Sequence, residues 1–386
     1  MLLSDHRVVS HLDLDTFFVS VECLKNSSLK GKPLLIGGKS DRAVVAACSY
    51  EARRFGVHSA MAMKLARRLC PHAIIMQGDM EEYSKYSGLV TQVIKNAVPS
   101  FEKASIDEFY IDMTGMEKHF GCAKFTRELK EKITGETGLP LSYGLSANKL
   151  ISKVATNEAK PNGQLEIPFG EEKSFLAPLP IQKMPMIGEK TAQTLKGLGI
   201  RIIRTLAEMP VEMMENVFGK TGIELWRRAN GIDESPVTPY REQKSISTEQ
   251  TFETDTIDMV FLQSQLVKMT QKIAYELRSQ NKLTGCVNVK IRYANFDTLN
   301  KQSTIAYTGS DHLLIPKVKE LFTKLYDRRM LIRLIGIRFS HLIPGNYQIN
   351  LFDDTQELIK LYQALDSVNN RYGKLMIIRA SGIVDS

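Results

Sequence analysis

The sequence predicts an α+β protein of several domains. Strand and helix patterns mix through about residue 168, residues 171–230 carry short helical patterns, and a second mixed region begins near residue 244. The chain has 386 residues, too many for one compact core, which favours two to four domains. Its 43% hydrophobic and 24% charged residues are typical of a soluble globular protein.

The first region combines short apolar strands with amphipathic helices. Alternating apolar residues predict strands, and apolar residues at intervals of three and four predict helices. The strands expected from these patterns are 7–15, 32–38, 43–52 (which runs into a helix), 105–113 and 141–147. The helices expected are one that begins at Thr16, then 59–69 (ended by Pro71), 83–98, 122–134 and 148–160.

The middle and last regions differ in character. Residues 171–230 predict short helices joined by glycine turns. The hairpin 187–190, with Gly188 and Lys190, is expected to hold a phosphate on its backbone N–H groups, and a plain helical turn is the alternative. Residues 233–245 predict a linker. Strands are then expected at 244–252, 285–296, 301–309 and 333–343, with helices near 258–280 and 313–326.

The net charge of +8 is concentrated in one part of the chain. Residues 241–342 contain 16 Lys and Arg against 10 Asp and Glu, a net of +6. A basic domain of this kind indicates a surface for a polyanion, most often nucleic acid, and a merely solvated face is the alternative.

The cysteines and the apolar runs indicate the compartment. Five cysteines are scattered without a C-x-x-C pair: Cys23, Cys48, Cys70, Cys122 and Cys286. This favours reduced thiols over a disulfide framework or a zinc module. The N-terminal residues show no secretory pattern, and nowhere do eighteen apolar residues run together. We therefore expect a cytoplasmic protein that does not span a membrane.

Three carboxylates lie in segments that otherwise predict buried strands. Asp13 ends an apolar strand, and Asp107 and Glu108 are neighbours within the stretch SIDEFYIDM. An unpartnered buried carboxylate is unfavourable, and these strands contain no matching Arg or Lys. Carboxylates suit Mg²⁺ and phosphoryl transfer, while surface acids on edge strands are the alternative. Since neighbours on a strand face opposite ways, Asp107 and Glu108 share a site only if the backbone turns there.

Four segments carry a family resemblance: HLDLDTFFVSVE, AACSYEARRFGVHSAM, SIDEFYIDMTG and GLSANKLISKVATNEAKPNG. Together they resemble the palm and fingers of a Y-family translesion DNA polymerase, most of all the bacterial DNA polymerase IV branch of the DinB/UmuC superfamily. The likeness extends over residues 7–342. It implies a right-hand polymerase with these parts: palm 1–18 and 78–168, small fingers 19–77, helix-hairpin-helix thumb 169–235, linker 236–243, and an α+β little finger 244–342.

The resemblance implies a metal centre and a nucleotide site. Asp13, Asp107 and Glu108 match the catalytic metal-binding carboxylates, with the Leu14 carbonyl as a further ligand, for two Mg²⁺ ions that Mn²⁺ can replace. Asp15 belongs to the same motif and is left as a structural residue. The nucleotide contacts implied are Phe17, Phe18, Tyr50, Arg53 and Lys160, with Phe18 as the steric gate against a 2′-hydroxyl.

One position departs from the family pattern. Many relatives carry a hydroxyl three residues before the tyrosine, where this chain has Ala47. Either this contact with the triphosphate is missing, or Cys48 or Ser49 supplies it.

The implied activity is attack of a primer 3′-hydroxyl on the α-phosphate of a dNTP, with release of pyrophosphate. Short fingers imply a roomy site, low fidelity and bypass of damaged template bases, and no proofreading nuclease is evident. The implied partners are primer–template DNA and dNTPs, and we expect a monomer.

Basic residues and a short peptide are the expected contacts with DNA and with a protein partner. The DNA contacts expected are Gly188, Lys190, Lys244, Lys290, Arg292, Lys301, Arg333 and Arg338, and strand alternation puts Lys290 and Arg292 on one face. The peptide QINLF (348–352) resembles the clamp-binding peptide of bacterial polymerases, with Gln348, Leu351 and Phe352 as contacts. The tail 343–386 also has a helical stripe, which either packs on the body or meets a second partner.

Two other functions stay open at this point. A nucleotide cyclase can use a similar palm, and a catalytically inactive DNA-binding accessory protein can share the fold. The helical hairpin and the basic region argue against the cyclase, and the complete carboxylate set argues against the accessory protein. Primer extension, as opposed to a cyclic product from ATP, distinguishes these functions.

Overall fold

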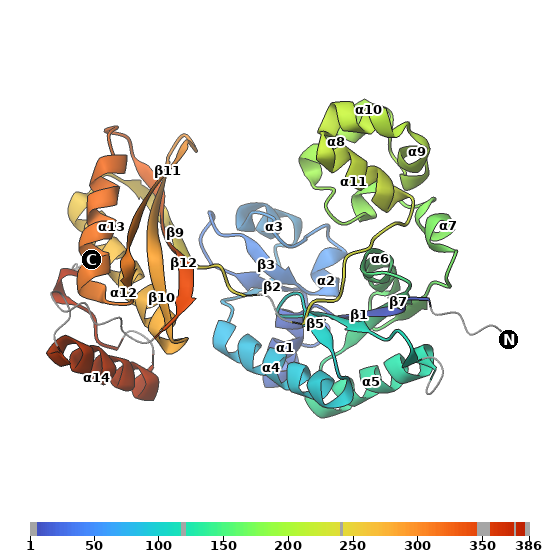
Figure 1. Cartoon of the computed structure of the whole chain (residues 1–386), viewed down its shortest axis with the longest axis horizontal. Coiled ribbons are helices and arrows are strands. Elements are labelled where there is room, and N and C mark those ends of the chain that lie inside the picture. The colour runs from blue at the N-terminus through green and yellow to red at the C-terminus, as the bar shows by residue number, and fades with distance from the viewer. Residues whose placement is uncertain (1–5, 117–120, 240–241, 346–355, 374–375, 383–386) are drawn as a thin grey trace. The chain divides into compact units, whose positions relative to one another are not determined.

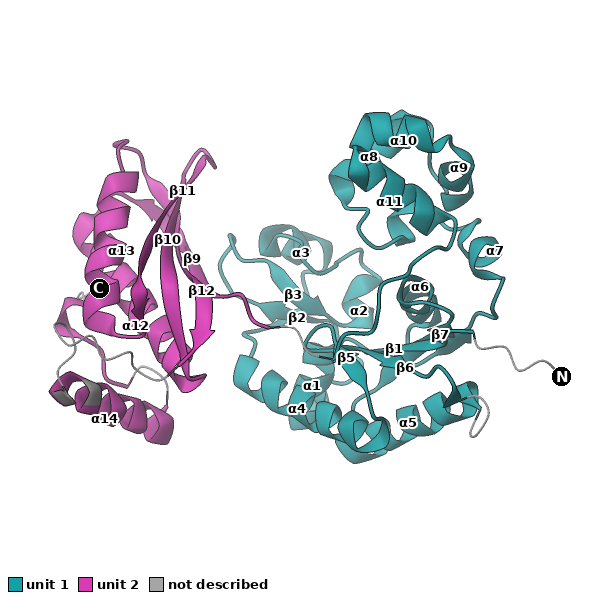
Figure 2. Ribbon diagram, in the orientation of Figure 1, with its two compact units in different colours: residues 1–241 teal, residues 242–386 magenta. Residues whose placement is uncertain are grey.

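The computed structural model describes residues 6–116, 121–239, 242–345, 356–373 and 376–382. The chain divides into two compact units, residues 1–241 and 242–386 (Figure 2). Each unit has sheets and hydrophobic clusters of its own. Within the described residues, no helix has the length and apolar character needed to cross a membrane.

A five-stranded sheet forms the centre of the first unit (Figure 1). Its strands in spatial order are β5 (Phe101–Lys103), β6 (Glu108–Asp112), β1 (Val9–Leu14), β7 (Leu141–Ser146) and β8 (Gln164–Glu166). Neighbouring strands are antiparallel except β7 and β8, which are parallel. The register pairs Asp13 with Glu108, so two carboxylates far apart in the sequence meet at one end of the sheet.

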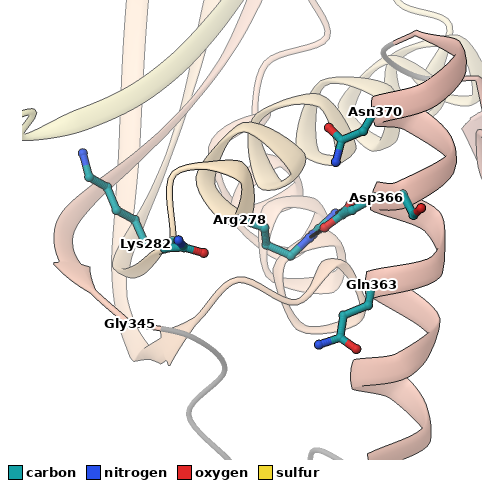
Figure 3. A pocket seen from close by; sticks show the side chains of 8 residues that line it. Arg278, Lys282, Gly345, Gln363, Asp366 and Asn370 are labelled. Atoms are coloured by element: carbon teal, nitrogen blue, oxygen red, sulfur yellow. Dashed lines mark hydrogen bonds and ion pairs between the residues drawn. The ribbon is translucent and has the colours of Figure 1, made fainter.

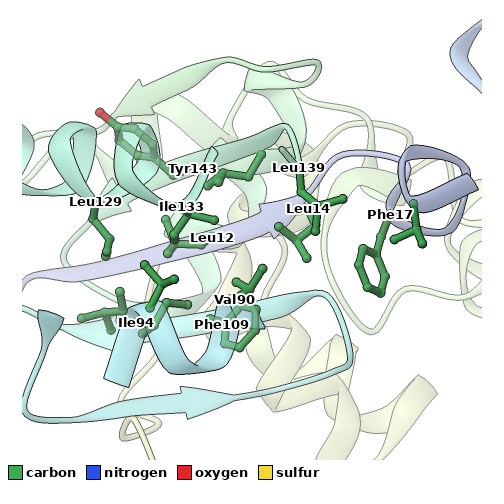
Figure 4. Close-up of a cluster of buried hydrophobic side chains, with 14 of the residues drawn as sticks. Leu12, Leu14, Phe17, Val90, Ile94, Phe109, Leu129, Ile133, Leu139 and Tyr143 are labelled. Carbon is green, nitrogen blue, oxygen red and sulfur yellow. The ribbon is translucent and has the colours of Figure 1, made fainter. Parts of the chain in front are cut away.

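One face of this sheet is apolar and is covered by helices α4 (Met80–Ala97) and α5 (Cys122–Thr137), with α1 (Phe17–Lys25) in the same hydrophobic cluster (Figure 4). Every second strand residue, such as Leu12 and Phe109, points into this cluster. The residues between them, Asp13 and Glu108 included, therefore point to the opposite face.

Helix α6 (Lys149–Ala159) covers that opposite face. Gly144 of β7 permits its close approach, because a Cβ at this position would lie 2.1 Å from the Ser152 carbonyl oxygen and 2.6 Å from the Thr156 nitrogen. The helix backbone thus lies directly on the sheet. Long side chains of α6 are thereby brought within reach of the strand carboxylates.

A smaller sheet lies between α1 and α4 in the sequence. Its strands in spatial order are β3 (Val45–Cys48), β2 (Leu34–Gly37) and β4 (Ile74–Met76), and the helices beside them are η1 (Ser27–Leu29), α2 (Tyr50–Arg53) and α3 (Met63–Leu69). This part has its own hydrophobic cluster, built around Leu35, Cys48 and Met63. It positions α2 beside the end of β1.

Short helices follow the central sheet. They are α7 (Glu172–Leu176), η3 (Ile181–Lys183), α8 (Glu189–Gly197), α9 (Ile203–Glu208), α10 (Val211–Phe218) and α11 (Lys220–Ala229). Their apolar residues form a cluster that includes Ile151 and Val154 of α6. This helical region has the character that the sequence predicts.

The second unit is a four-stranded antiparallel sheet with helices on one face (Figure 1). Its strands in spatial order are β11 (Thr298–Thr308), β10 (Lys282–Tyr293), β12 (Ile332–Pro344) and β9 (Ser245–Thr256), and its helices are α12 (Met259–Ser279) and α13 (Asp311–Leu325). The two helices share one hydrophobic cluster with the sheet residues that face them.

The C-terminal helix α14 (Gln356–Tyr372) and the short helix η4 (Ala380–Gly382) belong to the second unit. Tyr362 is almost fully buried, and its hydroxyl accepts the His312 backbone N–H at 3.0 Å. The Tyr275 hydroxyl donates to Asn370 across the junction between α12 and α14. The helix therefore packs back on the body, which was the simpler of the two expectations for the tail.

The sequence patterns miss three strands. β4, β5 and β8 have three residues each, too few to display an alternation. The strand expected at 105–113 is also shorter, since residues 105–107 form a bend and β6 begins at Glu108.

Candidate active site

Asp13, Asp107 and Glu108 come from two strand ends that meet. Asp13 and Glu108 are opposite each other in β1 and β6. Asp107 lies in the bend before β6, where its carboxylate accepts a hydrogen bond from the Ser105 hydroxyl and its carbonyl oxygen accepts the Leu14 N–H at 3.1 Å. The backbone thus bends at the place where the sequence requires a turn if Asp107 and Glu108 are to share a site.

Positive charge reaches two of these carboxylates from α6 and from the residue that follows it. The Lys160 Nζ lies 2.6 Å from Asp13 Oδ1. The Lys153 Nζ donates to both Glu108 carboxylate oxygens, at 2.8 and 2.7 Å. Two of the three carboxylates are thus held by lysines in this structure.

Lys153 was not among the residues singled out from the sequence, although a signal was present. Lys149, Lys153 and Lys160 are spaced by four and seven residues, which puts them on one side of a helix. Lys149 pairs with the buried Glu102 at 2.6 Å, so each lysine of the row takes one strand carboxylate. The strands provide no lysine or arginine for these carboxylates. Helix α6 and the residue after it provide three lysines.

Asp13 is poorly stabilised as an anion despite its lysine. Burial raises the pKa of Asp13 to about 7, Lys160 opposes the rise, and the nearby Glu108 and Asp107 charges add to it. The side chain is 7% exposed, so water gives it little help. Any further positive charge at this end of the sheet would stabilise the ionised carboxylate.

The donor set suits a divalent cation chemically. Within the described part of the chain, no three carboxylate, imidazole or thiolate groups already form a cluster able to hold a metal ion. Lys153 and Lys160 bind the carboxylate oxygens instead. Hard oxygen donors, mutual repulsion and the raised pKa of Asp13 are nevertheless the conditions that Mg²⁺ relieves. A cation would have to displace these two lysines.

Tyr50 and Arg53 come from the four-residue helix α2. The Tyr50 hydroxyl donates to Asp15 Oδ1 at 3.2 Å, and the Arg53 guanidinium lies 5.1 Å from the centre of the Tyr50 ring. Burial and the Asp15 charge raise the pKa of Tyr50, so its hydroxyl stays protonated. The structure thus ties both residues to the turn that follows β1.

Cys48 and Ser49, the two residues after Ala47, make contacts within the fold. The Ser49 hydroxyl donates to the Lys32 carbonyl oxygen at 3.1 Å and caps the start of α2. The Cys48 thiol is buried and donates to the Val57 carbonyl oxygen at 3.6 Å. Both groups are engaged within the fold.

Phe17 and Phe18 have different surroundings. Phe18 is half-buried and stacks on Tyr83, with ring centres 4.2 Å apart, and the Tyr83 hydroxyl donates to Glu22 at 2.9 Å. Phe17 is 3% exposed and its ring is part of the core. The Phe17 side chain is thus engaged in the core, and its backbone N–H in the first helical turn is the group left to contact a nucleotide.

Gly188 and Lys190 lie at the start of α8, where the sequence predicts a phosphate-binding turn. Gly188 is the N-cap residue, and both residues are exposed. Lys190 makes no ion pair with any residue that the structure describes. Its charge is available to an anion.

The basic residues of the second unit divide between the two faces of its sheet. The register of β10 and β12 places Lys290, Arg292 and Arg338 on the face away from the core. Lys290 and Arg338 line part of a polar hollow of about 530 Å³ on this face. Lys301 pairs with the core residue Val289 and so points to the other face.

The predicted DNA contacts of the second unit differ in whether another residue of the protein already engages their charge. Lys290 forms an ion pair with Glu249, whereas Arg338 makes no hydrogen bond or ion pair with a described residue. The Arg333 guanidinium lies 4.7 Å from the centre of the Phe296 ring. Lys244 is exposed just before β9. The clamp contacts Gln348, Leu351 and Phe352 lie outside the described residues.

The cavity in Figure 3, about 420 Å³, lies between α12 and α14. Arg278, one of its two basic residues, donates to both Asp366 oxygens at 2.7 Å and to Asp311 Oδ1 at 2.7 Å. With both carboxylates engaged, this guanidinium holds α14 on the body and offers no free charge to a ligand.

Three family models match the chain. The impB/mucB/samB family matches residues 12–157, the IMS family HHH motif matches residues 170–200, and the C-terminal domain of the impB/mucB/samB family matches residues 243–351.

Similar proteins span nearly the whole chain. It is 40% identical to a DNA polymerase IV of Dehalococcoides mccartyi, over 95% of each chain. It is 36% identical to a DNA polymerase IV of Treponema denticola, over 87% of this chain and 85% of that one. Among solved structures, a Y-family DNA polymerase chimera superimposes with a TM-score of 0.77 at 27% identity, covering 88% of this chain and 100% of the chimera.

Proposed function

The chain belongs to the Y-family DNA polymerases of the impB/mucB/samB group, and we propose that Asp13, Asp107 and Glu108 are its catalytic carboxylates. It is a DNA-directed DNA polymerase of the translesion type. Neither the cyclase nor the inactive accessory protein is favoured by these relationships. Polymerases of this family depend on a divalent metal.

The observation that carries the assignment is the meeting of β1 and β6. Their register puts Asp13 opposite Glu108, and the bend before β6 adds Asp107. A fold selected for stability alone gains nothing from burying Asp13, which raises its pKa to about 7, or from placing two further acids beside it. Strain of this kind is typical of a functional site.

We propose Mg²⁺ as the metal, with Mn²⁺ as a substitute. Asp13, Asp107, Glu108 and the Leu14 carbonyl oxygen would hold it. When bound, two such ions would neutralise the phosphate charge and orient the attacking and leaving oxygens. The chain's own part is to keep the three carboxylates at one strand end and to release the two lysines.

Lys160, Arg53 and Tyr50 are proposed to bind the triphosphate, together with the backbone N–H groups of Phe17 and Phe18. Lys160 brings a point charge that neutralises Asp13 until the nucleotide arrives. Arg53 brings a planar fork of donors that matches a phosphate. The N–H groups lie in the first turn of α1, where a helix favours an anion.

Phe18 is proposed as the steric gate. Its stacking on Tyr83 fixes the ring, and the Tyr83–Glu22 hydrogen bond fixes Tyr83 in turn. A ring supported from behind cannot swing away from a sugar. A 2′-hydroxyl would therefore clash with the Phe18 ring, which is held in place.

The parts of the chain are proposed to match the divisions inferred from the sequence. The palm is then 1–18 and 78–168, the fingers 19–77, the thumb 169–235, the linker 236–243 and the little finger 244–342. Gly188 and Lys190 would hold the DNA backbone from the thumb. Residues on the open sheet face of the second unit would hold it there, with Lys301 turned away from them.

The peptide 348–352 is proposed to bind a sliding clamp through Gln348, Leu351 and Phe352. Support comes from its sequence and from its place just after β12. We further propose a monomer that works in the cytoplasm, where its five free cysteines would stay reduced.

Primer extension by Asp107→Ala tests the assignment. We expect extension to be lost while primer–template binding survives, since Asp107 lies at the strand end and supports no buried contact. Asp112→Ala, which removes a carboxylate from the other end of β6, is the matched control and should extend primers. Near wild-type extension by Asp107→Ala would refute the role of Asp107.

A further inference from the structure

Asp15 is a buried carboxylate for which the polymerase chemistry has no assigned use. It is 1% exposed and lies in the turn between β1 and α1. Within the described residues, no lysine, arginine or histidine forms an ion pair with it. An unpaired buried carboxylate persists only when several hydrogen-bond donors are directed at it.

Three donors converge on Asp15 from distant parts of the chain. The Ser142 hydroxyl lies 3.0 and 2.9 Å from its two oxygens. The Asn162 backbone N–H donates to Oδ2 at 2.7 Å. The Tyr50 hydroxyl donates to Oδ1 at 3.2 Å. Asp15 therefore joins β7, the turn after α6 and helix α2.

Two of these donors lead directly to the proposed triphosphate contacts. Asn162 is two residues after Lys160, so the bond to Asp15 fixes the turn that carries the lysine. The Arg53 guanidinium lies over the ring of Tyr50. The Lys130 Nζ binds the Asn162 carbonyl oxygen at 2.7 Å, which holds the same turn from its other side.

The hydrogen bond from the Tyr50 hydroxyl to Asp15 also connects the small sheet with the central sheet. Tyr50 belongs to the helix beside the small sheet, whereas Asp15 follows a strand of the central sheet. Leu34 and Ile36 of β2 pack into the central cluster, and the Asp15–Tyr50 hydrogen bond adds a polar link between the two sheets. Losing it would let helix α2, which carries Arg53, shift relative to the turn that carries Lys160.

We propose that Asp15 is the positioning residue of the triphosphate pocket, holding Tyr50 and the Lys160 turn in register so that both bind one nucleotide. The proposal rests on the nucleotide contacts of the proposed function. It assigns Asp15 no contact with the substrate. Asp15 then has a role in nucleotide binding, beyond the structural role expected of it from the sequence.

Single-nucleotide incorporation by Asp15→Asn tests the proposal. The amide keeps the size of the side chain but weakens its acceptors. We expect the Kd for dNTP to rise about 5- to 20-fold, as for loss of a charge-assisted hydrogen bond, with the maximal incorporation rate and the Kd for primer–template nearly unchanged. Asp112→Asn is the matched control and should leave all three values unchanged.

A merely structural Asp15 gives a different result. It would lower the melting temperature and the fraction of active enzyme but leave the Kd for dNTP unchanged, which would overturn the proposal. A fall in that Kd would also overturn it, since Asp15 would then be competing with the nucleotide for the Tyr50 proton.

Two further results keep the test decisive. If Asp15→Asn is unfolded at the assay temperature, Tyr50→Phe removes the same link from its other end and should raise the Kd for dNTP; an unchanged Kd would overturn the proposal. The wild-type protein separates the two claims. If it fails to extend primers, the proposed function fails, whereas extension with an unchanged Kd in Asp15→Asn removes the role of Asp15 alone.

Discussion

Asp13 is a carboxylate whose charge the fold disfavours. Burial raises its pKa from 3.8 to about 7, with the Lys160 ion pair only partly compensating. Folding therefore takes up a proton between these pH values. The penalty for ionised Asp13 is absent below about pH 4 and fully present above about pH 7.

We predict that Asp13→Asn stabilises the metal-free protein at high pH. A pKa rise of about three units corresponds to roughly 2–4 kcal/mol, so the variant should gain that much free energy of unfolding at pH 8 and nothing near pH 4. Urea unfolding in the presence of a chelator measures it, with Asp112→Asn as the control. A variant that is less stable than wild type at pH 8 would mean that the Lys160 ion pair dominates.

Phe18 allows a test of sugar selection. We predict that Phe18→Ala raises incorporation of CTP relative to dCTP by about 10- to 100-fold, because the space for a 2′-hydroxyl opens. Tyr83→Phe keeps the ring under Phe18 but removes the bond to Glu22, so it should destabilise the protein and change discrimination far less than Phe18→Ala does. Unchanged discrimination in Phe18→Ala would remove Phe18 as the gate.

The residue scale also shows what a sequence can reveal of a site. Asp13, Asp107 and Glu108 stand out because charge interrupts an apolar strand. Lys153 does not stand out, because a lysine on a helix is ordinarily solvated, and its partner becomes visible only when α6 lies on the sheet. The role of Asp15 is hidden for the same reason, since its donors come from positions 50, 142 and 162.

At the scale of elements, the contact of α6 with β7 sets the lysine row. We predict that Gly144→Ala destabilises the protein by about 1–3 kcal/mol, as overpacking in a core does, and lowers primer extension. A Cβ would meet the α6 backbone at 2.1 Å, and moving α6 moves Lys153 and Lys160.

Gly88→Ala is the control for this prediction. Gly88 lies inside α4 with no heavy atom within 4 Å of an added Cβ. The same substitution should there stabilise the helix by about 0.5–1 kcal/mol. Thermal unfolding and extension rates measure both variants, and a Gly144→Ala protein as stable and active as Gly88→Ala would contradict the close approach of α6.

Elements differ in how well sequence patterns predict them. Long amphipathic helices such as α4 and α12 are predicted, since their apolar residues recur at helical spacing. β4 is missed because its three residues gain their partners from β2, which is nearly forty residues earlier in the chain. The register of Asp13 against Glu108 likewise depends on pairing between distant segments.

At the scale of the whole molecule, much of the excess positive charge lies in residues 241–342, which carry a net charge of +6. Arg338 lies on the open face of its sheet without a described partner, whereas Lys301 points to the helix face. We predict that Arg338→Ala weakens primer–template binding and reduces the slope of log Kd against log salt by about 1.

Lys301→Ala is the control with the same loss of charge. Because Lys301 lies on the other face, we expect its salt slope to stay near the wild-type value. Fluorescence anisotropy at several salt concentrations measures both variants. Equal effects of the two substitutions would mean that general charge, and not the open face, binds the DNA.

The most direct measurement of the catalytic assignment is the number of Mn²⁺ ions bound beside a dNTP and a primer that lacks its 3′-hydroxyl. Electron paramagnetic resonance counts these ions, with dNTP and DNA alone subtracted. We expect two ions in the wild-type complex, as two-metal transfer requires, and fewer in Asp13→Asn, Asp107→Asn and Glu108→Gln. A variant that combines all three substitutions gives the decisive result. An unchanged number of bound Mn²⁺ ions in it, with DNA and dNTP still bound, would show that these carboxylates do not hold the metal.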